Sequence, residues 1–325
     1  MSTIVYAQQQ AQTIFVDPVS GSDTNSGTSI APLKSLKHAV SLANGNDIAG
    51  TFTIKLLPGL YVLEDKVQLE RKTAGLVIEA SDLPDSKDWN PYKMPVISSV
   101  SANNSTVQFP HAAGILVAMN NVKISGLKFI GNANPVTRYY YPISRKDTLA
   151  TGLEISQCYF IGERNAAPIQ AAVWVHGSKL MVDHCVFFEC KNALVLIENI
   201  RDFSMTNSIV YGAYEAAVWF GAYHTPVRFS NNVISNCNFF WLRAEGTYPK
   251  YEFQNSLFAG NQSFMGHYTK SGLKPAGRNE HIEKNVQKNT KKVELITVGQ
   301  KGLITNYLHL SNGTMGSELK AGIFK

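Results

Sequence analysis

Apolar and polar residues alternate in an eleven-residue line that recurs along the middle of the chain. The copies begin at Leu153, Leu180, Phe203, Val227 and Tyr251, so successive starts lie 27, 23, 24 and 24 residues apart. Alternation with period 2 predicts a β-strand in each copy. A repeat in the low twenties is typical of a solenoid with one repeat per coil. Because a second apolar run follows each copy, the pattern predicts an all-β fold, a right-handed parallel β-helix.

The same pattern predicts which side chains face the interior. The first, third, sixth and eighth positions of each copy are apolar or small, as in Leu153, Ile155, Cys158 and Phe160. If successive coils stack in register, the eighth positions form one interior file. Its members are Phe160, Phe187, Val210, Ile234 and Phe258.

A polar residue occupies the fifth position of every copy. These residues are Gln157, His184, Asn207, Asn231 and Asn255. Side chains stacked at the parallel-strand spacing of roughly 4.8 Å bond to one another and to the backbone of the turn. We therefore interpret them as a structural ladder, with His184 as a ladder member and not as a base.

The N-terminal part resembles the start of many pectate-lyase-like secreted β-helix proteins. The resemblance rests on a strand at Ile14–Asp17, the Gly21-Ser22-Asp23 segment, a helix after Pro32, and Pro58-Gly59-Leu60-Tyr61, which looks like the P-G-x-Y turn of that superfamily. It implies an exported polysaccharide-active protein, but it carries over no catalytic residue. The helix, with Leu33, Leu36, Val40 and Ala43 on one face, is expected to cap the open end of the core.

The predicted organisation is a single domain over residues 13–325. Residues 13–100 form the N-terminal cap and first coils, 115–265 the regular coils, and 266–325 a basic segment with a closing strand near 316–324. Residues 1–12 are interpreted as the remnant of an export signal or as a disordered terminus. Export to the periplasm, the cell surface or the medium is the corresponding expectation.

Composition and charge narrow the possibilities. No apolar run approaches the roughly 18 to 20 residues that a membrane span needs. The four cysteines fall at inward positions and are expected to be buried free thiols. The net charge of +6 lies in the C-terminal part, since residues 1–269 hold 20 basic and 20 acidic residues. The basic segment 270–301 either meets a polyanion or is simply solvated, and no nucleic-acid-binding module is present.

Two groups of residues are candidates for substrate binding. The excursion between the copies at Val122 and Leu153 carries Arg138, Tyr139, Tyr140 and Arg145, and aromatic rings with guanidinium groups suit sugars and carboxylates. Trp174 and Trp241 are predicted to face outward on the second strands, three coils or about 14 Å apart.

The catalytic hypothesis is a lyase or epimerase-like enzyme acting on uronate-containing glycans. Such an enzyme needs a base and a cation beside the uronate carboxylate. His176, Arg243 and Glu245 lie where they could supply these groups. A non-catalytic glycan-binding or cell-surface β-helix protein is the first alternative. A glycoside hydrolase, which needs two carboxylates, is the second.

Cofactor signals are weak. No zinc or phosphate-binding motif occurs, so no metal site is predicted. The segment Asp23-Thr24-Asn25-Ser26-Gly27 spaces oxygen atoms as a calcium loop does, but it lacks the downstream glutamate, and the same residues are common in turns. Calcium therefore stays a minor alternative at Asp23.

Overall fold

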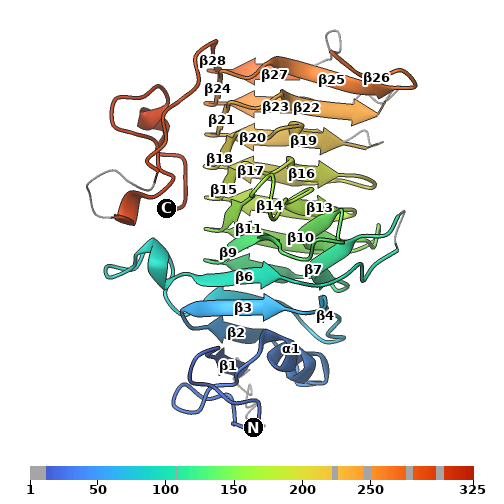
Figure 1. Ribbon diagram of the computed structural model, residues 1–325, viewed down its shortest axis with the longest axis vertical. Helices are drawn as coiled ribbons and strands as arrows, with labels where there is room; N and C mark the ends of the chain where they lie inside the picture. The colour runs from blue at the N-terminus through green and yellow to red at the C-terminus, as the bar shows by residue number, and fades with distance from the viewer. Residues whose placement is uncertain (1–11, 107–108, 222–225, 245–249, 276–280, 298–303) are drawn as a thin grey trace, which may run out of the picture.

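The computed structural model describes residues 12–106, 109–221, 226–244, 250–275, 281–297 and 304–325. The chain winds into a tall stack of coils with β1 and the helix α1 at one end and β27 and β28 at the other (Figure 1). Each regular coil contributes one strand to each of three sheets, and neighbouring coils pair in parallel. The predicted parallel β-helix is confirmed.

The first sheet holds the eleven-residue copies and has ten strands. They are β1 (Gln12–Val16), β2 (Phe52–Leu56), β5 (Leu76–Ala80), β8 (Val122–Ser125), β11 (Thr151–Ser156), β14 (Ser178–Asp183), β17 (Phe203–Thr206), β20 (Val227–Ser230), β23 (Tyr251–Gln254) and β27 (His281–Lys284). The second sheet follows a tight turn. Its strands are β3 (Gly59–Leu63), β6 (Pro95–Ser99), β9 (Lys128–Asn132), β12 (Tyr159–Ile161), β15 (Val186–Phe188), β18 (Ile209–Tyr211), β21 (Val233–Ser235), β24 (Leu257–Ala259) and β28 (Gln287–Asn289).

The third sheet contains the second apolar run of each repeat. Its strands are β4 (Val67–Leu69), β7 (Ala112–Val117), β10 (Tyr140–Arg145), β13 (Val173–Val175), β16 (Asn192–Leu196), β19 (Ala216–Phe220), β22 (Phe239–Ala244), β25 (Ser263–Thr269) and β26 (Gly272–Pro275). Among the described strands of this sheet, only β26 pairs in the antiparallel sense, as a hairpin with β25. Helical segments are α1 (Leu36–Asn44) and the 3₁₀ turns η1 (Pro91–Lys93), η2 (Ile304–Asn306) and η3 (Ser317–Leu319).

The interior file has the predicted register. Direct pairs run from Phe160 to Phe187, on to Val210, then Ile234, and finally Phe258. All five side chains lie in one buried cluster, and the rings of Phe160 and Phe187 stack at 4.9 Å. The continuous file confirms that coils lie directly over one another and bury one long core.

The predicted ladder forms in part, at the turn between the first and second sheets: among the described side chains, one hydrogen bond joins two of its five members. Asn231 donates from its amide to Asn207 Oδ1 at 2.7 Å, and Asn207 donates to Asp183 Oδ1 at 2.9 Å. Every ladder residue also has a left-handed backbone, with φ between 44° and 58°, and Gly126 (φ 73°) takes this place one coil earlier. Asparagine and glycine tolerate this conformation best, so the position is selected for its backbone as well as for its amide.

The N-terminal end differs from expectation in two details. Ser35, and not Pro32, begins the helix, because its hydroxyl accepts from the backbone N–H of His38. Leu36, Ala39, Val40 and Ala43 are its buried face. The expected turn at Pro58–Tyr61 is largely strand β3, which opens the second sheet.

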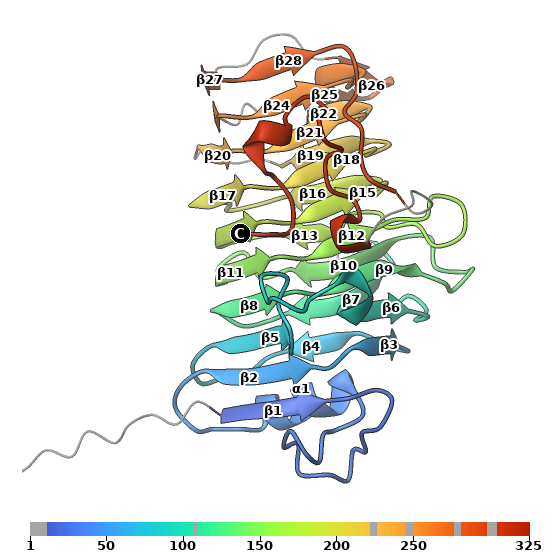
Figure 2. The same ribbon diagram turned by 90° about the vertical axis from the view of Figure 1, so that its left-hand side faces the viewer.

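The C-terminal segment covers the outer face of the second sheet (Figure 2). Leu308, Leu310, Ala321 and Ile323 pack there in a second apolar cluster with outward residues of β12, β15, β18, β21 and β24. The expected closing strand near 316–324 does not form, since Ser317–Leu319 is the 3₁₀ turn η3. The basic segment supplies β26, β27 and β28, so its described part is the last coil of the solenoid.

The four cysteines are buried free thiols, as expected. Within the described ranges, no helix has the length and apolar character needed to traverse a bilayer.

Candidate functional site

A stripe of large side chains runs along the outer face of the third sheet. Its members at successive coils are Trp174, Val195, Trp219 and Leu242, which are direct register partners. Tyr141, Trp174 and Val195 form a buried cluster separate from the interior core, and Trp219 packs against it. We call this surface the aromatic face. The strands that carry it lie one above another in Figure 1.

Trp241 is not on this face, which corrects the prediction. It pairs with Val218 and Met265 in the inward register, is 0% exposed, and packs 4.8 Å from the ring of Tyr251. In a strand, a shift of one residue moves a side chain to the opposite face. The register predicted from the sequence is shifted by one residue at β19 and β22, and this shift concealed Trp219, which follows Trp174 and Val195 along the stripe.

Two of the three proposed catalytic residues, His176 and Arg243, do not come together. Arg243 is in the inward register with Phe220 and is 7% exposed. His176 follows β13, three coils away. Glu245 lies outside the described residues. The expected His/Arg/Glu site is therefore not formed by His176 and Arg243.

His176 does lie on the aromatic face, but it is enclosed. Its ring packs edge-on against Trp174 at 4.9 Å, and the residue is 4% exposed. Burial lowers the pKa of His176, and the charge of Glu198, whose Oε2 is 3.8 Å from Nδ1, only partly opposes that shift. The imidazole is thus neutral at pH 7 and is shielded from any bound polymer.

The Tyr-rich excursion divides between interior and surface. Tyr140 is part of the buried core. Arg145 is 0% exposed and donates to the backbone carbonyls of His176 and Ser178 at 2.7 and 3.1 Å, so it supports a turn and cannot reach a substrate. Arg138 stays exposed over the ring of Tyr139. Tyr139 packs on Phe109 at the lower edge of the aromatic face.

A titratable cluster that sequence reasoning did not single out lies beside Trp219. Glu215 accepts from the Tyr268 hydroxyl through Oε1 and from Asn192 Nδ2 at 2.7 Å through Oε2. Lys191 Nζ is 3.4 Å from Oε1. The ring of Tyr268 is 6.3 Å from that of Trp219. We call Lys191, Glu215 and Tyr268 the acid–base cluster.

The cluster brings together residues from three non-adjacent stretches. Lys191 and Glu215 precede β16 and β19 on neighbouring coils, whereas Tyr268 comes from β25, two coils beyond β19. The spacing of Glu215 and Trp219 along the chain could be read from the sequence. The direction of the Tyr268 side chain, which brings its hydroxyl to Glu215, could not. Lys191 and Glu215 keep 30% and 17% of their side-chain surface exposed, so they remain within reach of a ligand.

The electrostatics of the cluster keep Tyr268 protonated. Burial raises the pKa of Tyr268, and the hydrogen bond and negative charge of Glu215 raise it further. Tyr268 is therefore a proton donor at neutral pH. Tyr214, which precedes Glu215 in the chain, forms a cation–π pair with Arg164 at 4.8 Å. Proton donor, carboxylate, ammonium and aromatic surface thus meet at one place.

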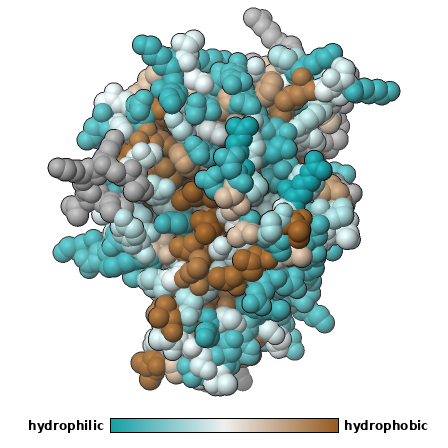
Figure 3. All heavy atoms as spheres, in the orientation of Figure 1, coloured by the Kyte–Doolittle hydropathy of each residue, from teal (hydrophilic) through white to brown (hydrophobic). Residues whose placement is uncertain are grey.

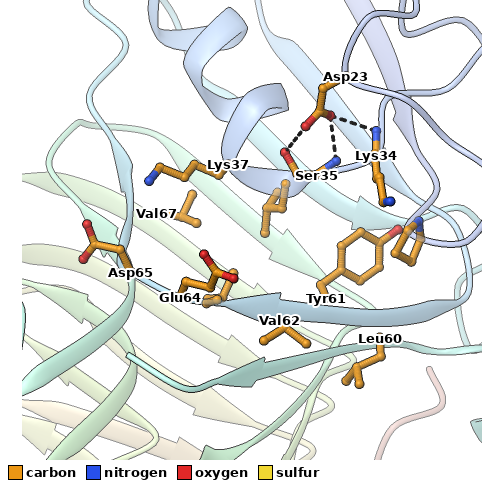
Figure 4. A pocket seen from close by; sticks show the side chains of 13 residues that line it. Asp23, Lys34, Ser35, Lys37, Leu60, Tyr61, Val62, Glu64, Asp65 and Val67 are labelled. Atoms are coloured by element: carbon orange, nitrogen blue, oxygen red, sulfur yellow. Dashed lines mark hydrogen bonds between the residues drawn. The ribbon is translucent and has the colours of Figure 1, made fainter. Parts of the chain in front are cut away.

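A separate pocket of about 410 Å³ lies at the N-terminal end, lined by Tyr61, Leu60, Val62, Lys34 and Asp23 among others (Figure 4). The Asp23 carboxylate accepts from the backbone N–H groups of Lys34 and Ser35 at 2.9 Å and from the Ser35 hydroxyl. Asp23 thus ties its loop to the start of α1. Among the described side chains, no group of three or more potential metal ligands is found.

Comparison with known proteins agrees with this architecture. Residues 97–258 match the family model described as a right handed beta helix region. No curated protein matches the chain. A rhamnogalacturonan lyase has a similar fold, with TM-score 0.56 and 10% identity over 90% of this chain and 84% of that one. A lacto-N-biosidase from Eubacterium ramulus gives TM-score 0.48 and 10% identity over 78% of this chain, which spans 57% of that protein.

At these identities, the similarity establishes the fold alone. The handedness named by the family model, the three parallel sheets and the repeat register all agree. The chain belongs to the right-handed parallel β-helix superfamily.

Proposed function

We propose that this protein is polysaccharide-active and that it holds a glycan chain against Trp219, the partly exposed member of the aromatic face, and the acid–base cluster beside it. The observation that carries the proposal is the acid–base cluster beside Trp219. The ring of a tryptophan offers a flat apolar surface to a sugar, and polar groups beside it set orientation. A polymer of this kind is met outside the cytoplasm, so we also propose that the protein is exported.

Lyase chemistry on a uronate-containing glycan fits the cluster best. The Lys191 ammonium would face the uronate carboxylate and stabilise the charge that develops when the adjacent C–H proton is removed. Glu215 would take that proton. As the carbon–carbon double bond forms and the glycosidic C–O bond breaks, Tyr268 would donate its proton to the departing oxygen. The hydrogen bond between Tyr268 and Glu215 then offers a direct route for the proton to return to Tyr268.

Two alternative functions remain. An epimerase-like reaction would use the same proton removal, with reprotonation on the opposite face of the sugar. Non-catalytic glycan binding is favoured by a specific observation, the burial of His176 and Arg243. A hydrolase has less support, because the acid–base cluster as described holds one carboxylate, Glu215, where that chemistry uses two.

The test is turnover of uronate-containing polysaccharides, followed by the absorbance of the unsaturated product. We expect Glu215→Gln and Tyr268→Phe to lower kcat by about 10² or more, as removal of a general acid or base does. Glu198→Gln is the matched control, since its carboxylate is 59% exposed at the other edge of the sheet, and it should retain activity.

Three results discriminate. Loss of activity in both cluster variants, with activity retained in the control variant, supports the lyase. Absence of turnover, with glycan binding that Trp219→Ala weakens, would identify the non-catalytic alternative. Neither turnover nor binding on any uronate polymer would refute the proposal.

A further inference from the structure

Cross-coil ion pairs neutralise three basic side chains on the first sheet. They join Lys55 to Glu79 at 3.4 Å, Lys123 to Glu154 at 2.7 Å, and Arg228 to Glu252 at 2.9 Å. Each pair bridges adjacent strands of the first sheet. Each of these three basic residues has its carboxylate on the neighbouring coil.

The last coil differs from the rest because five exposed lysines without such a partner among the described side chains fall within residues 270–292. Its exposed lysines without a carboxylate within 4.0 Å among the described residues are Lys270, Lys274, Lys284, Lys291 and Lys292. We call them the end lysines. Lys288 is different, since it pairs with Glu283 at 2.6 Å and lies 4.7 Å over the ring of Phe264. Hydrophilic residues predominate at this end of the molecule (Figure 3, top).

Protection of a free sheet edge is the first explanation to consider. Lysines on an edge strand discourage pairing with another chain, and Lys274 in β26 and Lys284 in β27 suit that purpose. The other three do not lie in strands. Lys270 is in the turn between β25 and β26, and Lys291 and Lys292 follow β28. Edge protection therefore leaves most of the positive charge unexplained.

The hairpin of β25 and β26 connects the end lysines to the proposed site. Tyr268 of the acid–base cluster is two residues before Lys270, and its register partner in β26, Leu273, is next to Lys274. A chain bound at Trp219 and Tyr268 and continuing along the solenoid axis would reach the tip of this hairpin, with Lys270, next. Lys274 pairs with His267 and lies on the opposite face of the hairpin from Tyr268. The end lysines thus form a positively charged surface at the end of the solenoid, next to the proposed site.

We propose that the end lysines form a second contact region for the same uronate-containing polymer. The inference rests on the proposed function for the identity of the polymer as a glycan. Lysine is a mobile point charge suited to carboxylates at irregular spacing. Nucleic acid is the less suitable polyanion, because binding to a single strand uses aromatic stacking platforms, and no exposed aromatic ring contacts the end lysines in the described part of the coil.

The experiment measures binding of the full chain to polygalacturonate and to its fully methyl-esterified form over a salt series. In the test variant all five end lysines are replaced by glutamine. The control variant carries Lys34→Gln, Lys37→Gln, Lys72→Gln, Lys87→Gln and Lys146→Gln, which remove the same charge from exposed positions elsewhere. Thermal unfolding confirms that both variants fold.

We expect the test variant to bind polygalacturonate about tenfold or more weakly at low salt, with a shallower salt dependence, because fewer counterions are released. Binding of the esterified polymer should be unchanged, and the control variant should resemble the wild type. Equal affinity of the test variant and the wild type, or an equal loss in the control, would overturn the inference. So would stronger competition by single-stranded DNA than by a short polygalacturonate.

Failure of the proposed function gives a different result. In that case, Trp219→Ala would leave polymer binding intact while the end-lysine variant lost it. If the inference alone fails, Trp219→Ala weakens binding and the end-lysine variant does not.

Discussion

At the scale of single residues, the turn ladder shows how one position meets two demands. Asn231 has φ 58°, and its amide donates to Asn207 Oδ1 and to the carbonyl of Leu319 at 2.9 Å. The sequence pattern revealed the hydrogen-bonding role. The left-handed backbone was not visible from spacing, although Gly126 at the equivalent place one coil before Gln157 was a usable signal.

Replacing Asn231 separates these two contributions. Asn231→Ala should destabilise the fold by about 2 kcal/mol, because it loses two hydrogen bonds and keeps a side chain in a left-handed conformation. Asn231→Gly should cost about 1 kcal/mol less, since glycine accepts that backbone. Urea unfolding measures both. Equal losses in the two variants would mean that the backbone conformation is unimportant.

The two tryptophans provide a matched test of the register. Trp241→Ala should destabilise by about 3–5 kcal/mol, because it opens a cavity in the core. Trp219→Ala should cost about 1 kcal/mol or less, since its side chain is only half-buried on the outer face. Chemical denaturation with fluorescence detection gives both values. The opposite ranking would place Trp219 inside and Trp241 outside.

At the scale of elements, the C-terminal segment is fastened to the body by both apolar and polar contacts. The Tyr159 hydroxyl donates to the carbonyl of Tyr307 at 2.8 Å, and Gln157 donates to that of Ile323 at 3.0 Å. Lys325 closes the segment through its backbone N–H, which donates to Asp85 Oδ1. Because this segment covers the outer face of the second sheet, a polymer cannot lie along that face.

His309 makes the attachment of this segment sensitive to acid. Burial lowers the pKa of His309 from 6.5 to about 4, and its ring is 4.7 Å from Phe324. Below pH 6.5 the unfolded chain gains a proton that the folded protein does not take up until about pH 4. Stability is therefore lost as the pH falls through this window.

Replacing His309 by phenylalanine should remove that loss. Between pH 6.5 and 4, His309→Phe should retain on the order of 2–3 kcal/mol more stability than the wild type, relative to their difference at pH 7. Urea midpoints at several pH values provide the measurement. His111 and His176, whose pKa values burial also lowers, contribute equally to both proteins. If the stabilities of the two proteins change with pH in parallel, folding does not lower the pKa of His309, and this account of the acid sensitivity is wrong.

The inward and outward faces of a strand could be predicted from the sequence in the first two sheets but not in the third. Copies such as Leu153–Glu163 have a strict internal alternation, so their strands and inward residues could be predicted. The third-sheet strands are short apolar runs in which inward and outward residues are both apolar, as in β22 with Trp241 and Leu242. Periodicity cannot choose a face there, and the catalytic hypothesis depended on that choice.

At the scale of the whole molecule, the stacking of coils brings residues together that are one repeat apart in the sequence. Lys191 and Glu215 are neighbours because coils repeat every 24 residues or so, which the sequence revealed. Tyr268 joins them only because its ring lies back across two coils, a side-chain direction that the repeat does not specify. The fold could thus be predicted from the sequence, whereas the site depends on side-chain directions that the sequence does not specify.

The central claim is that a glycan binds the aromatic face at Trp219. Titration calorimetry with a uronate oligosaccharide should show saturable binding to the wild type and at least about tenfold weaker binding to Trp219→Ala, the loss typical of a buried aromatic contact. Met181→Ala, at a 46% exposed residue on the outer face of the first sheet, should bind as the wild type does. Equal affinity of Trp219→Ala and the wild type would contradict the claim.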